Sequence, residues 1–208
     1  MDGIIFDVDG TLWDSTETVL ESWTQAITEN SNLDIDVSSP RLRGLFGKTM
    51  DEIYSALFPS LPKEEQQRLG DLCFAYENRL LETKPGILYE GVQEVFHTLS
   101  GKTPLFIVSN CQRGYIEIFL KVNKLEGTVK DHLCFGDTLV SKGQTILRLM
   151  EKNGLQDVVY VGDTQGDYLA CQEAGIPFIF AEYGFGDVPE AEYRIKKLTD
   201  LLEFSKGV

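Results

Sequence analysis

The second half of the chain alternates short apolar segments with longer segments whose apolar residues recur at helical spacing. Helices that join consecutive strands require a parallel sheet, because a parallel pair needs a long crossover connection. The pattern therefore predicts an α/β fold, with a parallel sheet covered by helices on both faces. Strands are expected at Ile4–Val8, Pro104–Val108, Leu133–Phe135, Val158–Val161 and Phe178–Ala181, with Tyr193–Ile195 as a marginal addition.

A long helical stretch interrupts this alternation directly after the first strand. No strand signal lies between Asp14 and Thr83, whereas Asp14–Glu17 and Thr49–Glu52 both resemble capping boxes. We expect a helix from Asp14 to Asn30 and a helical stretch over Ser39–Leu81. Residues 1–14 and 84–208 are thus predicted to form an α/β core domain, and residues 15–83 an inserted all-α domain. Helices of the core are expected at Gly91–Leu99, Tyr115–Val122, Ser141–Asn153, Gln165–Ala174 and Thr199–Ser205.

Charge and composition exclude several classes of partner. The 208 residues carry a net charge of −14, which disfavours nucleic acid and anionic membranes as partners. No segment is long and apolar enough to be a signal peptide or a membrane span. The four cysteines lie far apart without a CxxC pair, which favours reduced thiols and a cytoplasmic protein. Oligomeric state is left open.

Polar side chains collect where the predicted strands end. In open α/β sheets, ligands bind at the carboxyl ends of strands, near the point where the strand order reverses. Four carboxylates, two residues with hydroxyl or amide groups and one lysine are expected at this edge: Asp7, Asp9, Ser109, Asn110, Lys142, Asp163 and Asp167. Carboxylates without His or Cys companions are hard oxygen ligands, which suit Mg²⁺ better than zinc.

Asp7 and Asp9 can divide two chemical tasks between them. Asp7 leaves the strand in one direction, and Asp9, beside the bend that Gly10 permits, can point in another. One carboxylate can then be a nucleophile while the other donates and accepts a proton. Each residue also has a plainer interpretation: Asp-Gly is often only a turn, Ser-Asn a helix cap, and a lysine a solvated surface charge.

Taken together, these motifs resemble those of the haloacid dehalogenase superfamily. The matching segments are Asp7-Val-Asp-Gly-Thr11, Ser109-Asn110, Lys142 and Gly162-Asp163 with Asp167, in the family's order and spacing along nearly the whole chain. The resemblance implies a Rossmann-like core. The helical insertion resembles the C1 cap of phosphoglycolate phosphatase-like and β-phosphoglucomutase-like members.

The resemblance also implies catalytic and metal-binding roles. It makes Asp7 the nucleophile and a Mg²⁺ ligand. Asp9 becomes the general acid and base, and its main-chain carbonyl a further ligand. Asp163 would bind Mg²⁺, and Asp167 would bind it or orient the residues that do. The alternative for Asp167 is an acid that only interacts with a helix N-terminus.

The remaining motif residues are implied to bind the phosphoryl group. Ser109 and Asn110 would donate hydrogen bonds to it, and Gly10 and Thr11 would lie against it. Lys142 would neutralise charge on the phosphoryl group and on Asp7.

The inserted domain offers fewer clues about substrate. Arg41, Arg43 and Lys48 lie in the sequence PRLRGLFGKTM, which is rich in loop signals. Lys48 matches a position where related caps carry a basic residue that contacts substrate, and Arg43 is a second candidate. The alternative for all three is ordinary surface charge.

The sequence therefore predicts a Mg²⁺-dependent phosphatase acting on a small phosphorylated metabolite, phosphoglycolate-like or sugar-phosphate-like, through an aspartyl-phosphate. A phosphomutase of the β-phosphoglucomutase type would use the same residues, although Thr11 argues mildly against it. A phosphonate-cleaving enzyme, with Lys48 as its Schiff-base lysine, is a further alternative. A phospho-aspartate signalling domain would also gather acids and a lysine at strand ends, but the long helical insertion argues against that class.

Overall fold

The computed structural model describes residues 1–35 and 37–204. Its main sheet has six parallel strands in the order β5-β4-β1-β6-β7-β8. This arrangement confirms the predicted α/β class, and it includes the marginal strand. The strands are β1 Gly3–Phe6, β4 Leu105–Ser109, β5 Val129–Cys134, β6 Val158–Gly162, β7 Phe178–Ala181 and β8 Tyr193–Ile195.

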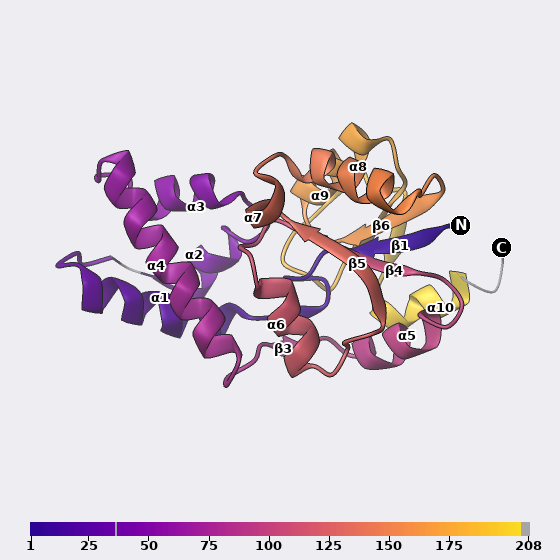
Figure 1. The fold of residues 1–208 in the computed structure, drawn as a ribbon, viewed down its shortest axis with the longest axis horizontal. Helices are drawn as coiled ribbons and strands as arrows, with labels where there is room; N and C mark the ends of the chain where they lie inside the picture. The colour runs from indigo at the N-terminus through magenta and orange to yellow at the C-terminus, as the bar shows by residue number, and fades with distance from the viewer. Residues whose placement is uncertain (36, 205–208) are drawn as a thin grey trace.

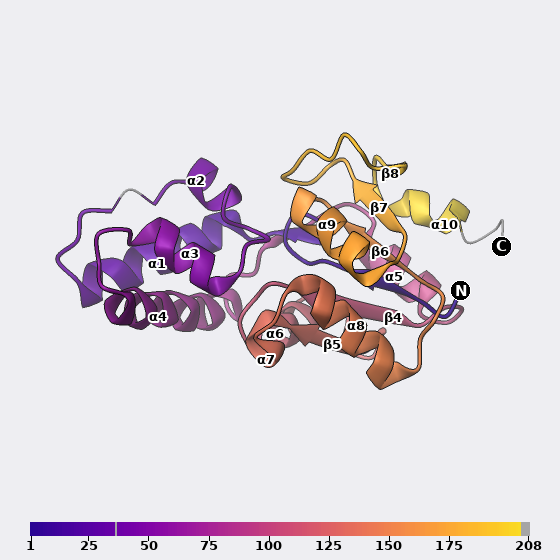
Figure 2. The ribbon, with the colours of Figure 1, turned by 90° about the horizontal axis from the view of Figure 1, so that it is seen from above.

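Helices cover both faces of this sheet (Figure 1, Figure 2). Successive side chains of a strand point to opposite faces, so Ile4 and Phe6 enter one apolar cluster while Ile5 enters another. The first cluster packs against α5 (Val92–Leu99), α6 (Tyr115–Val122) and α10 (Leu201–Phe204), and the second against α8 (Lys142–Asn153) and α9 (Gln165–Ala174). The near-continuous apolar strands are those of a sheet buried on both sides.

Four helices form a separate lobe beside the carboxyl edge of the sheet (Figure 1). They are α1 Thr16–Asn30, α2 Ser39–Arg43, α3 Met50–Leu57 and α4 Lys63–Leu81. We call them the helical lobe. A third apolar cluster lies wholly within it, centred on Trp23 and Phe74, whose rings meet edge to face at 5.5 Å. The lobe therefore has its own core.

A two-stranded antiparallel ladder joins the lobe to the sheet domain, and no sequence signal predicted it. β2 (Trp13–Asp14) leads into the lobe and pairs with β3 (Ile87–Leu88), which leads out. Strands of two residues are too short to show a periodic pattern. The pairing brings the entry and exit of the insertion together at one narrow connection.

Several predicted boundaries were wrong. Asp14, the predicted first residue of the first helix, lies in β2, where its carboxylate accepts a hydrogen bond from Thr16 N at 2.9 Å. The helical stretch predicted over Ser39–Leu81 is confirmed, and it consists of the three helices α2, α3 and α4. The strand predicted at Leu133–Phe135 begins at Val129, and Phe135 instead opens the short helix α7 (Phe135–Thr138). β5 is an edge strand, so it carries polar residues that hide its extent.

The C-terminal helix also begins differently. A 3₁₀ turn, Leu198–Asp200, precedes α10, which ends at Phe204. Ser205, the predicted last residue of this helix, lies outside the described residues.

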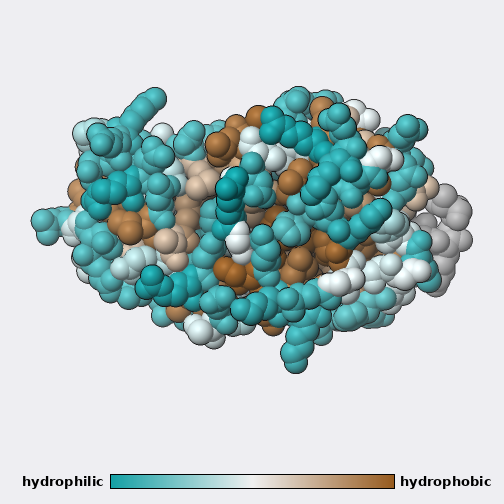
Figure 3. All heavy atoms as spheres, in the orientation of Figure 1, coloured by the Kyte–Doolittle hydropathy of each residue, from teal (hydrophilic) through white to brown (hydrophobic). Residues whose placement is uncertain are grey.

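The surface is mainly polar, as the acidic composition leads one to expect. Figure 3 shows a largely hydrophilic face with smaller hydrophobic patches between the charged side chains. None of the described helices combines the length and the apolar character that a membrane span needs.

The strand order reverses beside β1. Along the chain, β4 and β5 extend the sheet to one side of β1, and β6, β7 and β8 extend it to the other. The carboxyl ends of β1 and β6 therefore flank the switch point, where α/β sheets bind their ligands.

Candidate active site

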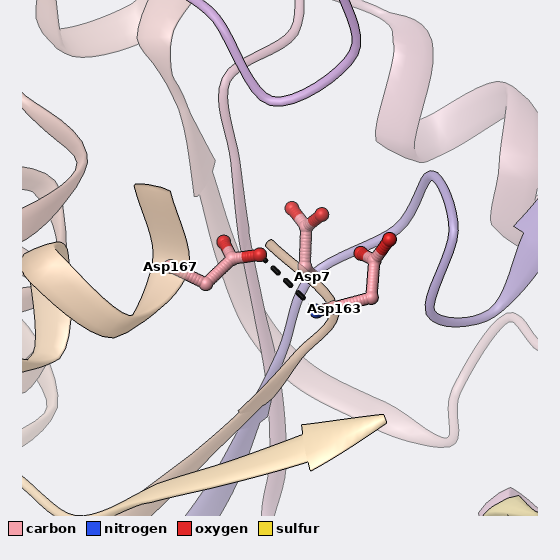
Figure 4. Close-up of side chains that lie close together, drawn as sticks. All are labelled: Asp7, Asp163 and Asp167. Carbon is pink, nitrogen blue, oxygen red and sulfur yellow. Dashed lines mark hydrogen bonds between the residues drawn. The ribbon is translucent and has the colours of Figure 1, made fainter. Parts of the chain in front are cut away.

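Three buried carboxylates lie together at the switch point. Asp7 follows β1, Asp163 follows β6, and Asp167 occupies the first turn of α9. One oxygen from each lies within 4.8 Å of the other two (Figure 4), and at most 1% of any of these residues is exposed. Three ionised carboxylates this close together and this deeply buried repel one another strongly unless a cation lies among them.

Lys142 supplies one such cation. It is the first residue of α8, and Ser141 caps the helix by accepting a hydrogen bond from Gln144 N. Its Nζ donates to Asp7 Oδ1 at 3.0 Å and to Asp167 Oδ1 at 2.6 Å. Burial alone would lower the pKa of Lys142, but the two carboxylates raise it, so the amine stays charged.

One ammonium group does not balance three carboxylates. Burial raises the pKa of Asp7 to about 7, against the opposing pull of Lys142 and with the help of the Asp167 charge. Burial and the neighbouring charge of Asp167 also raise the pKa of Asp163 well above its usual value. The raised pKa values show that Lys142 alone does not stabilise all three ionised carboxylates, and a divalent cation would favour their ionised forms.

Backbone and hydroxyl donors fix the orientation of Asp167. Its Oδ2 accepts hydrogen bonds from the main-chain N–H groups of Asp163 at 3.2 Å and Thr164 at 3.0 Å, and from the Thr164 hydroxyl at 2.7 Å. Tyr160 adds a longer contact, 3.4 Å, to Oδ1. Protein donors bind both oxygens of Asp167. Asp167 is therefore better suited to holding the loop at Asp163 in place than to being a metal ligand.

Gly10 lets the first loop approach Asp163 closely. It adopts a φ of +81°, and a Cβ there would lie 2.1 Å from Asp163 Oδ2. Any side chain at this position would therefore collide with the carboxylate as well as strain the backbone. The hydroxyl of Thr11 donates to Asp163 Oδ1 at 3.0 Å, and Phe185 N donates to Oδ2 at 2.8 Å. The Thr11 hydroxyl is therefore bound to the Asp163 carboxylate.

Asp9 lies apart from the three-carboxylate cluster. Its Oδ1 accepts hydrogen bonds from Tyr115 Oη at 2.5 Å, Ser15 Oγ at 2.7 Å and Trp13 Nε1 at 3.1 Å. Burial raises the pKa of Asp9 to about 6, although these three donors favour the ionised form. Two carboxylates only two positions apart therefore have different neighbours: Asp7 a cation and two acids, and Asp9 three neutral donors.

A small cavity lies between the sheet edge and the helical lobe. Its volume is ≈ 30 Å³, enough for one or two water molecules. Asp7, Asp9, Ser109 and Asn110 line its sheet side. Asn110 Nδ2 donates to the main-chain oxygen of Gly47, in the lobe, at 2.8 Å. The lobe thus contacts the sheet edge directly beside this cavity.

The basic residues predicted to contact substrate do not line this cavity. Arg43 is exposed, pairs with Asp14 at 3.0 Å and lies over the ring of Phe185. Lys48 is exposed as well, next to Gly47. Arg41 donates to Ala56 O at 3.0 Å within the lobe. Neither Lys48 nor Arg43 lines the cavity, so the substrate contact predicted for them stays a prediction.

The donor set fits a hard divalent cation. All three clustered side chains offer carboxylate oxygens, and no His or Cys is among them. Asp7 and Asp163 are the residues that could hold Mg²⁺, and Asp167 lies close enough to contribute.

Sequence reasoning missed the partners of Asp9. Tyr115 opens α6, more than a hundred positions away, and Trp13 and Ser15 lie shortly after the first strand, where no motif marks them as partners of an aspartate. No local pattern identifies a tyrosine that a fold brings to an aspartate from another element. The apolar period of α6 did predict that Tyr115 faces inward.

Fold and site together define a class: a Rossmann-like α/β domain with acids at its switch point and a helical insertion after the first strand. The family model of haloacid dehalogenase-like hydrolases matches residues 4–181, and the chain belongs to this family.

Individual relatives support the same placement. The phosphoglycolate phosphatase of Synechococcus elongatus is 29% identical over 195 residues, covering 90% of this chain and 86% of the relative. That of Xylella fastidiosa is 28% identical over 191 residues, covering 88% and 80%. The structure of a predicted phosphoglycolate phosphatase from Haemophilus somnus has the same fold, with a TM-score of 0.85 and 20% identity over 99% of this chain and 98% of that one.

Proposed function

We propose that the protein is a Mg²⁺-dependent phosphatase of a small phosphorylated metabolite, phosphoglycolate-like or sugar-phosphate-like, that works through an aspartyl-phosphate. The observation that carries the proposal is the different surroundings of Asp7 and Asp9. Membership of the hydrolase family and similarity to two phosphoglycolate phosphatases support it.

In this proposal Asp7 is the nucleophile. Its carboxylate oxygen attacks phosphorus while the bond from phosphorus to the ester oxygen breaks, and the departing oxygen takes the proton of the Asp9 carboxyl group. Water then attacks the phosphorus of the Asp7 acyl phosphate and gives a proton back to Asp9, which frees inorganic phosphate and restores Asp7. Because Tyr115, Ser15 and Trp13 all bind Oδ1 of Asp9, its Oδ2 is the oxygen we assign to proton transfer.

The neighbouring groups manage the charge. Asp7, Asp163 and the main-chain carbonyl of Asp9 would hold Mg²⁺, which when bound offsets the negative charge of the carboxylates and of the phosphoryl group. Lys142 stabilises the ionised Asp7 and the phosphoryl oxygens, and Asp167 keeps Lys142 and the Asp163 loop in position.

Phosphoryl recognition is assigned to the loops beside Asp7. We propose that Ser109 and Asn110 donate hydrogen bonds to the phosphoryl oxygens. For Asn110 this requires that its bond to Gly47 O is broken when the lobe opens. The segment Gly10–Thr11, whose N–H and hydroxyl donors already bind Trp13 O, Val8 O and Asp163 Oδ1, is proposed to lie against the phosphoryl group. The connection β2–β3 would be the hinge, with residues 15–83 acting as a cap that excludes water when closed and residues 1–14 and 84–208 as the core. The four unpaired cysteines support a reducing, cytoplasmic environment.

The test compares wild-type protein with Asp7→Asn on p-nitrophenyl phosphate in the presence of Mg²⁺. The variant is expected to lose at least about 10³-fold in kcat, because it removes the nucleophile. A chelator should abolish wild-type activity, and added Mg²⁺ should restore it.

Asp157→Asn is the matched control. Asp157 is exposed and directly precedes β6, at the opposite end of that strand from Asp163, so the same change there should leave kcat within about twofold. If Asp7→Asn kept a substantial part of the wild-type rate, the covalent mechanism would be wrong. Isomerisation of a sugar phosphate without net release of phosphate would identify a mutase instead.

A further inference from the structure

A third buried carboxylate lines the same cavity, from the helical lobe. Glu77, on α4, lines the cavity wall opposite Asp7 and is 3% exposed. Its Oε2 accepts a hydrogen bond from Trp23 Nε1 at 2.5 Å, and its Oε1 accepts one from Gln112 Nε2 at 3.0 Å. A glutamate is rarely this buried without a cation. The proposed catalytic steps do not use it.

The part of the cavity around Glu77 contains no positive charge. None of the described residues that line it is Lys, Arg or His. Apart from Glu77 and Gln112, the lobe side and its surroundings are apolar or aromatic: Trp23, Leu42, Leu45, Phe46, Ile53 and Phe74. This wall faces the space that remains for a leaving group once a phosphoryl group lies against Asp7.

The wall therefore disfavours an anionic leaving group. A substrate carboxylate enclosed here would lose its hydration, lie beside Glu77 and find no cation. A hydroxyl or ammonium group would instead donate a hydrogen bond to a carboxylate already held in place by Trp23 and Gln112, each of whose oxygens has spare acceptor capacity. Burial raises the pKa of Glu77 to about 8, which is the expected state of an acid still lacking such a partner.

We propose that Glu77 is a specificity-determining residue that accepts a hydrogen bond from a hydroxyl or ammonium group of the leaving group. On this inference, which rests on the proposed phosphatase function, the substrates are phosphate monoesters of polyols or amino alcohols. Esters of hydroxy acids such as glycolate are poor substrates, despite the names of the two relatives.

A purely structural role for Glu77 makes a different prediction. Gln112 also donates to Asn78 Oδ1 at 2.8 Å, so the Glu77–Gln112 bond could serve only to tie α4 to the loop after β4. Loss of that tie would lower stability and the turnover of every substrate alike, and the ranking of substrates would not change.

The experiment measures kcat/KM for four small esters of comparable size: glycerol phosphate, ethanolamine phosphate, propyl phosphate and phosphoglycolate. For wild-type protein, kcat/KM for glycerol phosphate, ethanolamine phosphate or both should exceed that for phosphoglycolate by at least about tenfold. The value for propyl phosphate should lie between that of the preferred ester and that of phosphoglycolate. Glu77→Gln, which keeps the shape but cannot ionise when an ammonium group binds, should reduce the preference for ethanolamine phosphate over phosphoglycolate by about tenfold or more.

Glu64→Gln is the control, because Glu64 is exposed in the first turn of the same helix and should leave the ranking unchanged. The inference is overturned if phosphoglycolate is hydrolysed as well as the donor-bearing esters, or if Glu77→Gln shifts the ranking no more than the control does. Should Glu77→Gln not fold, the wild-type ranking alone decides. If Asp7 never acquires a phosphoryl group and no ester is cleaved, the proposed function itself has failed, and the inference with it.

Discussion

Two walls of one cavity bury carboxylates in opposite ways. On the sheet side, Asp7 lies beside two further acids and is paired with Lys142. On the lobe side, Glu77 has only the neutral donors Trp23 and Gln112. The first arrangement concentrates charge and calls for a cation, whereas the second leaves a single acid that gains most from a hydrogen-bond donor brought by a ligand.

The two sides of the cavity also differ in how they are held in the fold. The sheet side is built from strand ends whose parallel neighbours fix them in register, so its acids cannot shift far. The lobe side belongs to helices with their own core, connected through the short β2–β3 ladder. In the proposed function, chemistry that must be held to fractions of an ångström would lie on the sheet side, and substrate choice on the helical lobe.

Among the changes that test this comparison, Asp9→Asn is expected to have the largest effect on turnover. Without its proton, turnover of an alkyl phosphate should fall by about 10²–10⁴-fold. With p-nitrophenyl phosphate, whose leaving group needs no proton, a burst of p-nitrophenol equal to the enzyme present should precede slow turnover. Stopped-flow absorbance measures both phases.

Metal affinity provides the control for Asp9→Asn. The proposed ligand at this position is the main-chain carbonyl, so the Mg²⁺ concentration that gives half-maximal activity should stay within about threefold of the wild-type value. Loss of metal binding together with loss of rate would show that the side chain of Asp9 belongs to the charged cluster after all, and the two environments would no longer be distinct.

A smaller effect concerns stability and its pH dependence. Burial raises the pKa of Glu77 from its usual 4.5 to about 8, and the Asp9 charge adds to the shift. The folded state therefore holds a proton that the unfolded chain releases between these values, so this group makes folding less favourable as pH rises through that window, by on the order of 1 kcal/mol per pH unit.

Glu77→Gln should remove the contribution of Glu77 to the pH dependence of the free energy of unfolding. Urea unfolding at several pH values between about 5 and 8 measures it, and the variant should gain stability relative to wild type as pH rises. Asp9 and Cys73 lie near Glu77 and keep their own contributions in both proteins. A parallel pair of stability curves would contradict the raised pKa of Glu77, and it would mean that Trp23 and Gln112 already stabilise the ionised carboxylate without a ligand.

The smallest effect is expected for Lys48→Ala. Lys48 is exposed and lies outside the cavity wall, so its loss should change kcat/KM by less than about threefold for every ester in the panel. A selective tenfold loss for phosphoglycolate would instead support the role implied by the resemblance. It would place an anion-binding cation in the lobe and weaken the case for Glu77.

Most of the sheet side could be predicted from sequence. Asp7 and Asp163 each follow directly on a buried apolar strand and Ser109 ends another, and parallel strands bring their carboxyl ends to one edge whatever the connecting helices do. Lys142 was predictable because it opens the helix that leads into β6.

The lobe side could not be predicted in the same way. Glu77 sits within an apolar stripe of α4, and the helical period only indicates which positions face inward. Which buried position meets Asp7 across a cavity depends on how four helices pack and on a two-residue ladder, and neither leaves a local signal. The edge strand β5 was misplaced for a related reason, since exposure to solvent on one side removes the apolar pattern.

The most direct test of the central claim is to look for the phosphoryl group on Asp7. Wild-type protein would be mixed with ester and Mg²⁺, quenched in acid during turnover, digested and analysed by mass spectrometry. The account predicts one added phosphoryl group on the peptide that contains Asp7, absent in Asp7→Asn and stronger in Asp9→Asn. An active enzyme with no such adduct at any quench time, or with the phosphoryl group on another residue, would contradict it.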